Sequence, residues 1–491
     1  PNCGPNWMSA QEVALRLLAL IFAACAFEQS PASTPQRMAL LAGAIAAHAR
    51  RIPPTLSYAR AQDNNHRIAE ALGLLAAGRA LAQHPEAARW RRLGWRELNA
   101  ALQSQIEPDG TYTQHSMNYH RLMLQAVVQA PLFGKDYPPP IRHRLAAATT
   151  WLLAQIDPQT GEGPNLGAND GALILPLAAA DFNDLRPAAQ ASARAFLGQA
   201  AFPPGPWDET GLWLNQTVIG GSPILVATEK PAALPSPAVH RLTSRESWAT
   251  LRAVRFHQRP SHADQLHVDL WWRGDNVALD AGTFRYTAPA PWDNSLARTS
   301  VHNTVTVNDL DQMQRGGRFL WLDWAQARLL PANSASGALT AQHDGYRRLG
   351  IFHRRALQLS GRDHWLVTDQ LVPWPESPLG DAREQSFQFR LHWLLPDWPW
   401  SLNETAITLS RPGGGKLNLR LTAAFPEGDL PSTTISLARA GIALAGDASV
   451  APIDGWVSPT YNVKIPALSF AFLAQSPLPL TMISEWVLGD E

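Results

Sequence analysis

The chain has few cysteines, no excess of charge of either sign and no long uninterrupted apolar run. Its 491 residues include only two cysteines, Cys3 and Cys25, which are too few for a disulfide framework and do not stand in a metal-binding spacing. The 41 basic and 41 acidic residues give a formal net charge of zero, which excludes the broad positive field that holds nucleic acid through its phosphates. An acidic polymer would have to be recognised by local arginine, asparagine and histidine side chains.

The most apolar early stretch, "ALRLLALIFAACAF" at residues 14–27, is interrupted by Arg16 and is too short to span a bilayer. It also lacks the cleavage-site pattern of a signal peptide, so we expect a buried helix and no membrane contact. Because the chain opens on "PNCGPNW" without an initiator methionine, we interpret it as a mature or trimmed protein.

The periodicity of apolar residues divides the chain into two halves, and the length alone predicts about two to four domains. Up to about residue 230, apolar residues recur every three or four positions, which predicts successive amphipathic helices paired as a toroid or solenoid of hairpins. From about Val239 the period changes to two, which predicts an antiparallel β-sandwich. The proline-rich stretch 220–238 is the expected linker, so we place the domains at residues 1–230 and 231–491.

Tryptophan is abundant, with 19 residues. These indole rings are suited to core and interface packing and equally to stacking against sugar rings. The sequence leaves both uses open.

Polar residues gather where three of the predicted helices begin. Asn64, Asn65 and His66 open one helix, and a capping role explains one asparagine but not two asparagines and a histidine. A second cluster enters the next helix, and it comprises His115, Asn118, Tyr119, His120 and Arg121. A third comprises Asn165, Asn169 and Asp170, for which we slightly favour a turn. Polar groups at helix starts above cores of Ala and Leu favour a cleft lining.

The strand half contains a stretch, residues 259–286, that is rich in histidine and aspartate. His262 and Asp264 stand two apart and would share one face of a strand, and a turn at "RGDN" would return Asp280 beside them. His302 begins a further predicted strand. Two imidazoles and a carboxylate suit zinc or a similar divalent ion. A hydrogen-bonded polar network is the alternative, and spacing alone favours that network.

Several blocks occur in the order typical of one enzyme family, and the resemblance that they carry extends over nearly the whole chain. They are "NWMSAQEVALRLL", "NNHRIAEALGL", "DGTYTQHSMNYHR", "HADQLHVDLW", "LDAGTFRY" and "RTSVHNTVTVND". With these blocks the sequence resembles the heparinase II/III group of polysaccharide lyases. The resemblance implies a multidomain fold, with an N-terminal incomplete (α/α) toroid followed by a C-terminal antiparallel β-sandwich. It also implies cleavage of uronate-containing polysaccharides by β-elimination.

The resemblance assigns roles to three residues of the helical half. Asn65 matches the family asparagine that neutralises the uronate, and His66 beside it can also donate a hydrogen bond to the growing charge. Tyr119 matches the tyrosine that protonates the leaving oxygen and in some substrates also removes the proton. His120 and Arg121 could lower the pKa of this phenol, and Arg121 could instead pair with a carboxylate or sulfate. The other expected substrate contacts are His115, Asn169 and Tyr286.

One position departs from the family pattern. Many members carry His-x-His-x-Asp, in which the first histidine is catalytic and the second binds metal, but here Pro260 stands first and His262 aligns with the metal ligand. His66, His115 or His257 could supply the missing base, or the reaction could use a different one.

The sequence therefore predicts a periplasmic or secreted lyase whose partner is an acidic polysaccharide, and a glycosaminoglycan of the hyaluronan, chondroitin or heparan type is the expected substrate. A structural divalent ion on His262, Asp280 and His302 is expected, with zinc first and manganese or calcium as alternatives. The alternatives for function are an alginate or exopolysaccharide lyase and a non-catalytic carbohydrate-binding protein. Nucleic acid is not expected as a partner, and the sequence gives no oligomeric state.

Overall fold

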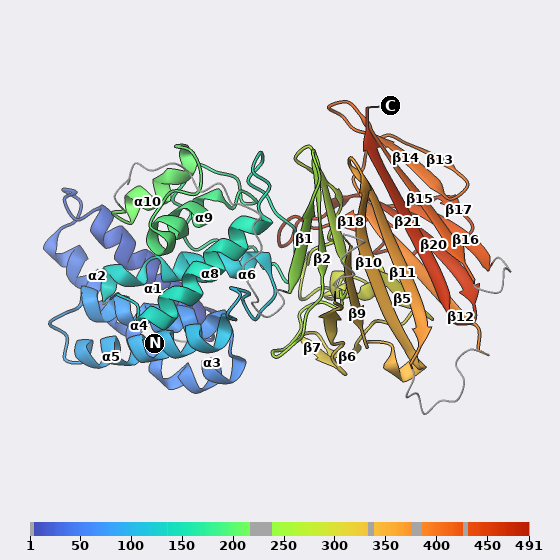
Figure 1. The fold of residues 1–491 in the computed structure, drawn as a ribbon. Helices are drawn as coiled ribbons and strands as arrows, with labels where there is room; N and C mark the ends of the chain where they lie inside the picture. Colours follow the sequence, from blue (N-terminus) through green and yellow to red (C-terminus); the bar gives the residue numbers. More distant parts are fainter. Residues whose placement is uncertain are drawn as a thin grey trace. The chain divides into compact units, whose positions relative to one another are not determined.

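The protein is described by a computed structural model over residues 4–134, 136–216, 238–331, 338–374, 385–425 and 431–490. It divides into two compact units, one helical and one built of sheets, which Figure 1 shows in blue to green and in green to red respectively. The helical unit contains residues 4–114, Tyr119–Ile156 and residues 172–216. The sheet unit contains His115–Asn118, Asp157–Gly171 and residues 238–490. The predicted boundary at residues 230 and 231 lies outside the described residues.

The described part of the first half is helical, as its periodicity predicted. The helices are α1 (Ala10–Ala26), α2 (Pro35–Arg51), α3 (Leu56–Gln62), α4 (Asn65–Ala80), α5 (Ala87–Gln105), α6 (Met117–Val127), α7 (Ala130–Phe133), α8 (Pro139–Gln155), α9 (Arg186–Ser192) and α10 (Glu209–Trp213). Within the described ranges, none of these helices combines the length and the apolar character needed to cross a membrane. The toroidal course of the helices stays a prediction.

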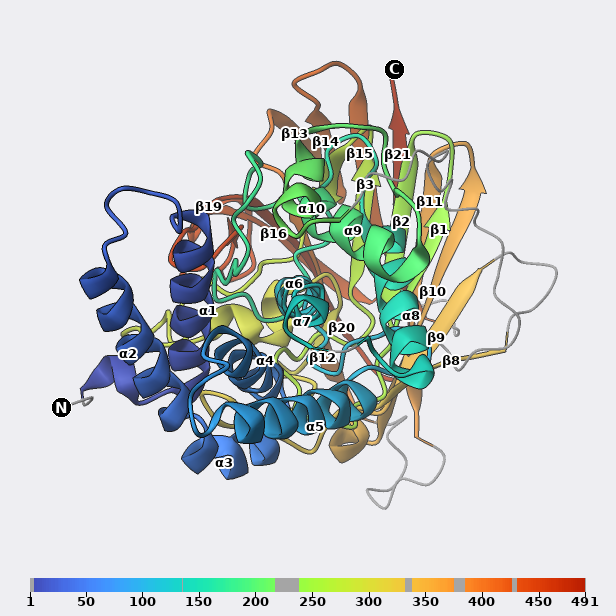
Figure 2. The same ribbon diagram turned by 90° about the vertical axis from the view of Figure 1, so that its left-hand side faces the viewer.

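Helix α4 lies in the core of the helical unit, beside α1 and α5 (Figure 2). Two glycines permit the close approach of these helices. A Cβ atom on Gly73 would lie 2.9 Å from the Cβ of Ala14 on α1, and a Cβ on Gly94 of α5 would lie 2.6 Å from the carbonyl oxygen of Ala71. Because α4 is buried along almost its whole length, its first residues have a fixed position in the unit.

The second half consists of antiparallel sheets, which confirms the prediction of a sheet-rich C-terminal domain. A four-stranded sheet is formed by β1 (Val239–Thr243), β2 (Ser247–Arg252), β3 (Val268–Trp272) and β4 (Asp275–Ala278). An eight-stranded sheet has the order β13 (Trp400–Asn403), β14 (Ala406–Ser410), β15 (Lys416–Ala424), β21 (Leu480–Gly489), β11 (His364–Pro373), β10 (Ile351–Gly361), β9 (Leu339–His343) and β8 (Ala327–Leu329).

The remaining strands form smaller sheets. A five-stranded sheet has the order β17 (Ile442–Gly446), β16 (Ser432–Arg439), β20 (Leu468–Ser476), β12 (Phe387–Leu395) and β5 (Val305–Val307). Two hairpin-like pairs are β6 (Gln314–Gly317) with β7 (Leu320–Leu322), and β18 (Trp456–Val457) with β19 (Ile465–Pro466).

One hydrophobic core joins the larger sheets. It takes Trp365 and Leu417 from the eight-stranded sheet, Phe389 and Phe470 from the five-stranded sheet, and Leu270 from the four-stranded sheet. Strand β10 shows the alternation on which the prediction rested, because Ile351, His353, Arg355 and Leu357 are buried and the residues between them are partly exposed. The core therefore fixes the ends of β3, β4 and β5, from which the candidate metal ligands extend.

Candidate active site and metal centre

The start of α4 is shaped by a cap that involves only one of its two asparagines. The side-chain oxygen of Asn64 accepts a hydrogen bond from the backbone N–H of His66, at 3.1 Å. The backbone N–H of Asn65 donates instead to Oε1 of Gln114, at 3.0 Å. Capping therefore accounts for Asn64, and it leaves the roles of the buried Asn65 and the half-buried His66 to be explained.

A buried glutamine, Gln105, joins this turn to the segment that precedes α6. Its Nε2 donates to Oδ1 of Asp63 at 3.0 Å and to the carbonyl of Asn64 at 3.1 Å. Its Oε1 accepts from the hydroxyl of Tyr112 at 3.1 Å. Since α6 follows that segment and carries the half-buried Tyr119 in its first turns, one side chain ties the start of α4 to the chain leading to Tyr119.

Helix α4 also buries a carboxyl group one turn after His66. Glu70 is only 1 % exposed, and one of its oxygens, Oε2, has no hydrogen-bond partner among the described residues. Burial raises the pKa of Glu70 to about 8, against the opposing charge of Arg51. Glu70 is therefore a protonated acid at neutral pH.

The two residues after Tyr119 are buried in the helical unit. His120 stacks on Trp151 with ring centroids 4.5 Å apart, and its Nε2 lies 2.9 Å from the carbonyl oxygen of Ala148. Burial lowers the pKa of His120 to about 4, so its ring is neutral. Arg121 donates to the carbonyls of Phe182 and Ala172. Both residues pack within the unit, and their predicted part in catalysis stays a prediction.

In the sheet unit, His262, Asp280 and His302 converge as predicted. Each offers one ligand atom, these atoms lie within 4.8 Å of one another, and all three residues are buried. Asp280 Oδ1 accepts a hydrogen bond from the backbone N–H of Gly282 at 2.8 Å, and His302 Nδ1 lies 2.7 Å from the carbonyl oxygen of Arg298. Nδ1 of His302 must therefore donate, which leaves the lone pair of Nε2 for a metal.

The donor atoms of this triad fit a divalent cation. Both ring nitrogens of His262, Nε2 of His302 and Oδ2 of Asp280 are buried without a hydrogen-bond partner among the described residues. Burial, followed by the nearby His302, lowers the pKa of His262 to about 3, so this imidazole is neutral and able to coordinate. Two imidazoles and a carboxylate form a donor set that zinc accepts.

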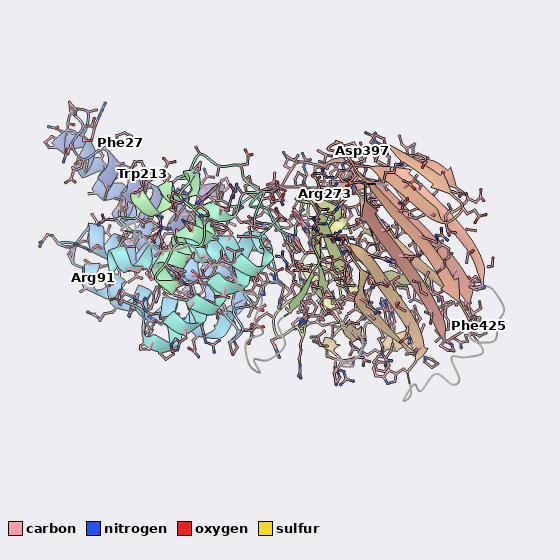
Figure 3. The ribbon with its side chains drawn as sticks, turned by 45° about the horizontal axis from the view of Figure 1, so that its top comes forward. Phe27, Arg91, Trp213, Arg273, Asp397 and Phe425 are labelled. Atoms are coloured by element: carbon pink, nitrogen blue, oxygen red, sulfur yellow. The ribbon has the colours of Figure 1, made fainter. Side chains whose placement is uncertain are left out.

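The chain brings the triad together through one hairpin and two loops. Strands β3 and β4 are joined at Arg273 and Gly274, both of which have positive φ, and Asp280 follows β4. Arg273, labelled in Figure 3, forms ion pairs with Glu246 at 2.8 Å and Asp490 at 2.6 Å, which anchor this turn.

The expectation that His262 and Asp264 share a strand face is wrong. Residues 261–266 precede β3 in an irregular segment, because the backbone of Ala263 bonds to the loop around Ala297 instead of to a neighbouring strand. His302 likewise precedes β5 and follows a single 3₁₀ turn, Thr299–Val301.

A third histidine, His267, lies beside the triad but in a different role. Its Nδ1 accepts a hydrogen bond from the backbone N–H of Asn303 at 3.1 Å, so the neutral ring carries its proton on Nε2. Nε2 lies 3.8 Å from Oδ2 of Asp280 and 3.7 Å from Oδ2 of Asp269. In this tautomer His267 is a donor facing the carboxylates, not a metal ligand.

A second set of buried polar groups lies next to His262. Nε of Arg252 is 2.9 Å from Oδ1 of Asp264, and the two side chains are 2 % and 0 % exposed. The pair lacks hydrogen-bond geometry, and the remaining nitrogens of Arg252, both oxygens of Asp264 and Nδ1 of His115 have no partner within the described ranges.

His115 is held in this set by its backbone and by Phe256. Its φ of 47° is left-handed, and its ring meets Phe256 edge-on with centroids 5.5 Å apart. Burial, and then the charge of Arg252, lowers the pKa of His115 to about 3. The ring is neutral and can accept a proton only weakly, although it remains able to donate or accept a hydrogen bond.

The other predicted contacts also lie in the sheet unit. The backbone N–H of Asn169 donates to Oγ1 of Thr283 at 2.9 Å, and its side chain donates to the carbonyl of Pro459 at 3.4 Å. Tyr286 packs between Phe319 and Tyr461. The structure thus places the predicted catalytic residues in the helical unit and the metal triad in the sheet unit.

Comparison with known proteins identifies the family. The sequence matches the heparinase II/III N-terminus over residues 4–137 and the heparinase II/III-like C-terminal domain over residues 227–478. The chain belongs to the heparinase II/III family of polysaccharide lyases. No protein among those with curated descriptions matches it significantly.

Solved structures of heparinases share the fold. A crystal structure of heparinase III superposes with a TM-score of 0.73 at 15% identity, covering 100% of this chain and 71% of that one. A heparinase III with methylated lysines gives 0.69 at 16% identity, with 98% and 67% covered. A mutant of the heparan sulfate lyase HepC from Pedobacter heparinus gives 0.64 at 20% identity, with 98% and 68% covered. At these identities the likeness shows the fold alone.

Proposed function

We propose that this heparinase II/III family member cleaves uronate-containing glycosaminoglycans by β-elimination. The observation that carries the proposal is the occurrence of Asn65 and His66 at the start of α4 and of Tyr119 in α6. The buried Gln105 bonds the turn before α4 to Tyr112, in the segment that leads to α6. These side chains supply the hydrogen-bond donors and the acid-base group that elimination from a uronate requires.

In the proposed reaction, Asn65 and His66 donate hydrogen bonds to the carboxylate of the uronate. The charge that grows on this group as the C5 proton leaves is thereby stabilised. The C5–H bond and the C4–O4 bond break, a C4=C5 double bond forms, and the leaving O4 receives a proton. No water is added to the product.

Tyr119 is proposed to act as both base and acid, because Pro260 occupies the usual position of a catalytic histidine. As a phenolate it accepts the C5 proton and then returns this proton to O4. An ordinary phenol has a pKa of about 10, so the phenolate needs nearby positive charge, and Arg121 on the same helix is the proposed source.

If one residue acts as both base and acid, it can react only with uronates of one configuration at C5. The C5 proton and O4 must lie on the same face of the sugar, as they do in glucuronate, whereas its C5 epimer iduronate holds them on opposite faces. We therefore propose hyaluronan, chondroitin or glucuronate-rich heparan sulfate as substrates, and a periplasmic or secreted location that gives access to them.

The triad of His262, Asp280 and His302 is proposed to hold one divalent ion, with zinc as the first candidate and manganese or calcium as alternatives. The bound ion would supply a cross-link of the loop before β3, the β3–β4 hairpin and the segment before β5. His267 is proposed to position the carboxylate of Asp280 through its Nε2 proton.

The test is a substrate panel followed by ultraviolet absorbance, since the C4=C5 bond is conjugated with the carboxylate. Hyaluronan, chondroitin sulfate, dermatan sulfate, heparan sulfate and alginate would be incubated separately with the protein. Product from glucuronate polymers and none from iduronate-rich dermatan is the expected result. Product from alginate alone would favour the alginate lyase alternative, which the family resemblance also permits.

A non-catalytic carbohydrate-binding protein is the second candidate, because Pro260 replaces a histidine that many relatives use. Binding of a polymer without product from any member of the panel would favour it.

A further inference from the structure

The ammonium group of the half-buried Lys464 lies over aromatic rings in the sheet unit. Its Nζ lies 3.1 Å from the ring centroid of Trp456, 4.4 Å from that of Trp292 and 5.7 Å from that of Phe284. The rings also contact one another, since Trp292 meets both Trp456 and Phe284 at steep angles. Such a cage fixes a lysine, which otherwise samples many rotamers.

This cation has no acidic partner in the part of the chain that the structure describes. None of the ion pairs there includes Lys464, and burial, which lowers its pKa, is the sole resolved influence on its titration. Aromatic faces attract a cation but do not neutralise its charge. The sheet unit therefore presents a positive charge that is positioned by aromatic rings and is not neutralised by a described carboxylate.

A second group of rings and a second cation adjoin the cage. The backbone N–H of Asn462 donates to the carbonyl of Phe284 at 2.7 Å, which aligns the segments 284–286 and 461–464. Arg285 donates to the side chain of Asn462, and the backbone N–H of Tyr286 reaches the hydroxyl of Tyr461 at 3.3 Å. The ring of Tyr286 contacts Tyr461 at 5.3 Å and the exposed Phe319 at 5.1 Å.

These residues form one strip of aromatic rings that includes the cation Lys464 and adjoins Arg285. We define the aromatic strip as Phe284, Tyr286, Trp292, Trp456, Tyr461 and Lys464. Phe284 is buried, whereas Tyr286, Trp292, Trp456 and Tyr461 are only half-buried, so part of each of these four side chains reaches the surface. Neither the metal triad nor the proposed reaction uses any member of the strip except the predicted contact Tyr286.

We propose that the aromatic strip binds acidic sugar units of the polysaccharide beyond the unit that is cleaved. This inference rests on the proposed function for the class of its ligand. Sugar rings stack their C–H faces on tryptophan and tyrosine, and Lys464 and Arg285 pair with carboxylate or sulfate groups. A neutral glucan would use only the rings, so the caged cation selects an acidic chain.

The experiment compares Lys464→Gln with Lys416→Gln, which removes the same charge from an exposed position on β15 of the same unit. Both are made in a Tyr119→Phe background, so that the probe is not consumed. Isothermal titration calorimetry would measure the Kd of a chondroitin sulfate decasaccharide, with a neutral dextran oligosaccharide of equal length as the second probe.

Lys464→Gln is expected to raise the Kd for the chondroitin decasaccharide about tenfold, the loss of one charge-assisted contact. Lys416→Gln should leave this Kd unchanged, and Lys464→Arg should restore most of the affinity. With Tyr119 intact, Lys464→Gln should raise KM and leave kcat unchanged, as expected for binding that is equal in ground and transition states.

Two results would overturn the inference. One is an equal Kd for chondroitin sulfate in the Lys464→Gln and Lys416→Gln variants. The other is that Lys464→Gln weakens binding of the neutral dextran and of the acidic chondroitin decasaccharide by the same factor. A lowered melting temperature would reveal a folding defect in Lys464→Gln. In that case Trp456→Phe, which keeps an aromatic ring against Lys464, is the second variant, and its affinity for the chondroitin decasaccharide should fall by a smaller factor. If the unmodified protein forms no product from any polymer but Lys464→Gln still weakens binding, the strip stands and the proposed lyase activity falls.

Discussion

Glu70 should make the stability of the protein fall as the pH rises from weakly acidic to weakly alkaline. Its carboxyl is buried on α4, and its pKa is raised from 4.5 to about 8 by that burial. Between these values the folded state keeps a proton that the unfolded state has lost, so unfolding releases a proton and is favoured by higher pH. The stability contributed by the neutral acid is fully present below pH 4.5 and is lost progressively up to pH 8.

The size of this effect follows from the linkage relation. One proton corresponds to about 1.4 kcal/mol of unfolding free energy per pH unit, so the loss across the window is a few kcal/mol, on the order of 3 to 5. Glu70→Gln fixes the side chain in a neutral form of nearly the same shape. It should match the unmodified protein at pH 4.5 and exceed its stability at pH 8.5 by most of this amount.

Urea unfolding of the full chain at a series of pH values would measure the difference. Glu28→Gln removes the same charge from an exposed position on the chain after α1, and serves as the matched control. Taking the difference between variant and parent removes the contribution of every other titrating group. Parallel curves for Glu70→Gln and the parent from pH 4.5 to 8.5 would refute the argument, because they would mean that Glu70 ionises normally in the fold.

The other predictions concern the proposed chemistry and the metal. Tyr119→Phe should retain the melting temperature and reduce kcat by about 10²-fold or more, since it removes only the acid-base hydroxyl; near-normal turnover would remove Tyr119 from the reaction. Elemental analysis of the purified protein should find about one divalent ion per chain. Chelation or His302→Ala should lower the melting temperature, because the ligands couple metal binding to folding. A melting temperature that neither change lowers would mean that the three residues form a polar network instead. His267→Gln should keep the metal affinity, because its amide can still donate toward Asp280, whereas His267→Leu should weaken that affinity by about 10- to 100-fold. A competition titration with a chelator measures both variants, and equal affinities would show that His267 does not position the carboxylate.

Much of the architecture could be predicted because it depends on local pattern. The three- and four-residue spacing of apolar residues gives the helices, and the two-residue spacing gives strands such as β10 and β11. Asp280 and His302 could be anticipated for a related reason, since they flank β4 and β5, whereas His262 lies in an irregular segment before β3. The family resemblance favoured a metal site at these residues, whereas their spacing alone favoured a hydrogen-bonded polar network.

What escaped prediction depends on contacts between distant positions. The tautomer of His267 is set by the backbone of Asn303, and the buried partner of Arg252 is Asp264. Residues 115–118 and 157–171 belong to the sheet unit, and periodicity says nothing about which unit a connecting segment joins. The buried acid Glu70 occupies an ordinary helical position, so only packing reveals its raised pKa.

The most direct test of the proposed reaction is to digest chondroitin sulfate in water enriched in heavy oxygen and to weigh the products by mass spectrometry. Elimination breaks the C4–O4 bond without adding water, so the new ends should carry no heavy oxygen, and one end of each cut should be an unsaturated uronate. Tyr119→Phe should suppress these products. Saturated products that carry one heavy oxygen at each cut would show hydrolysis instead and would contradict the account.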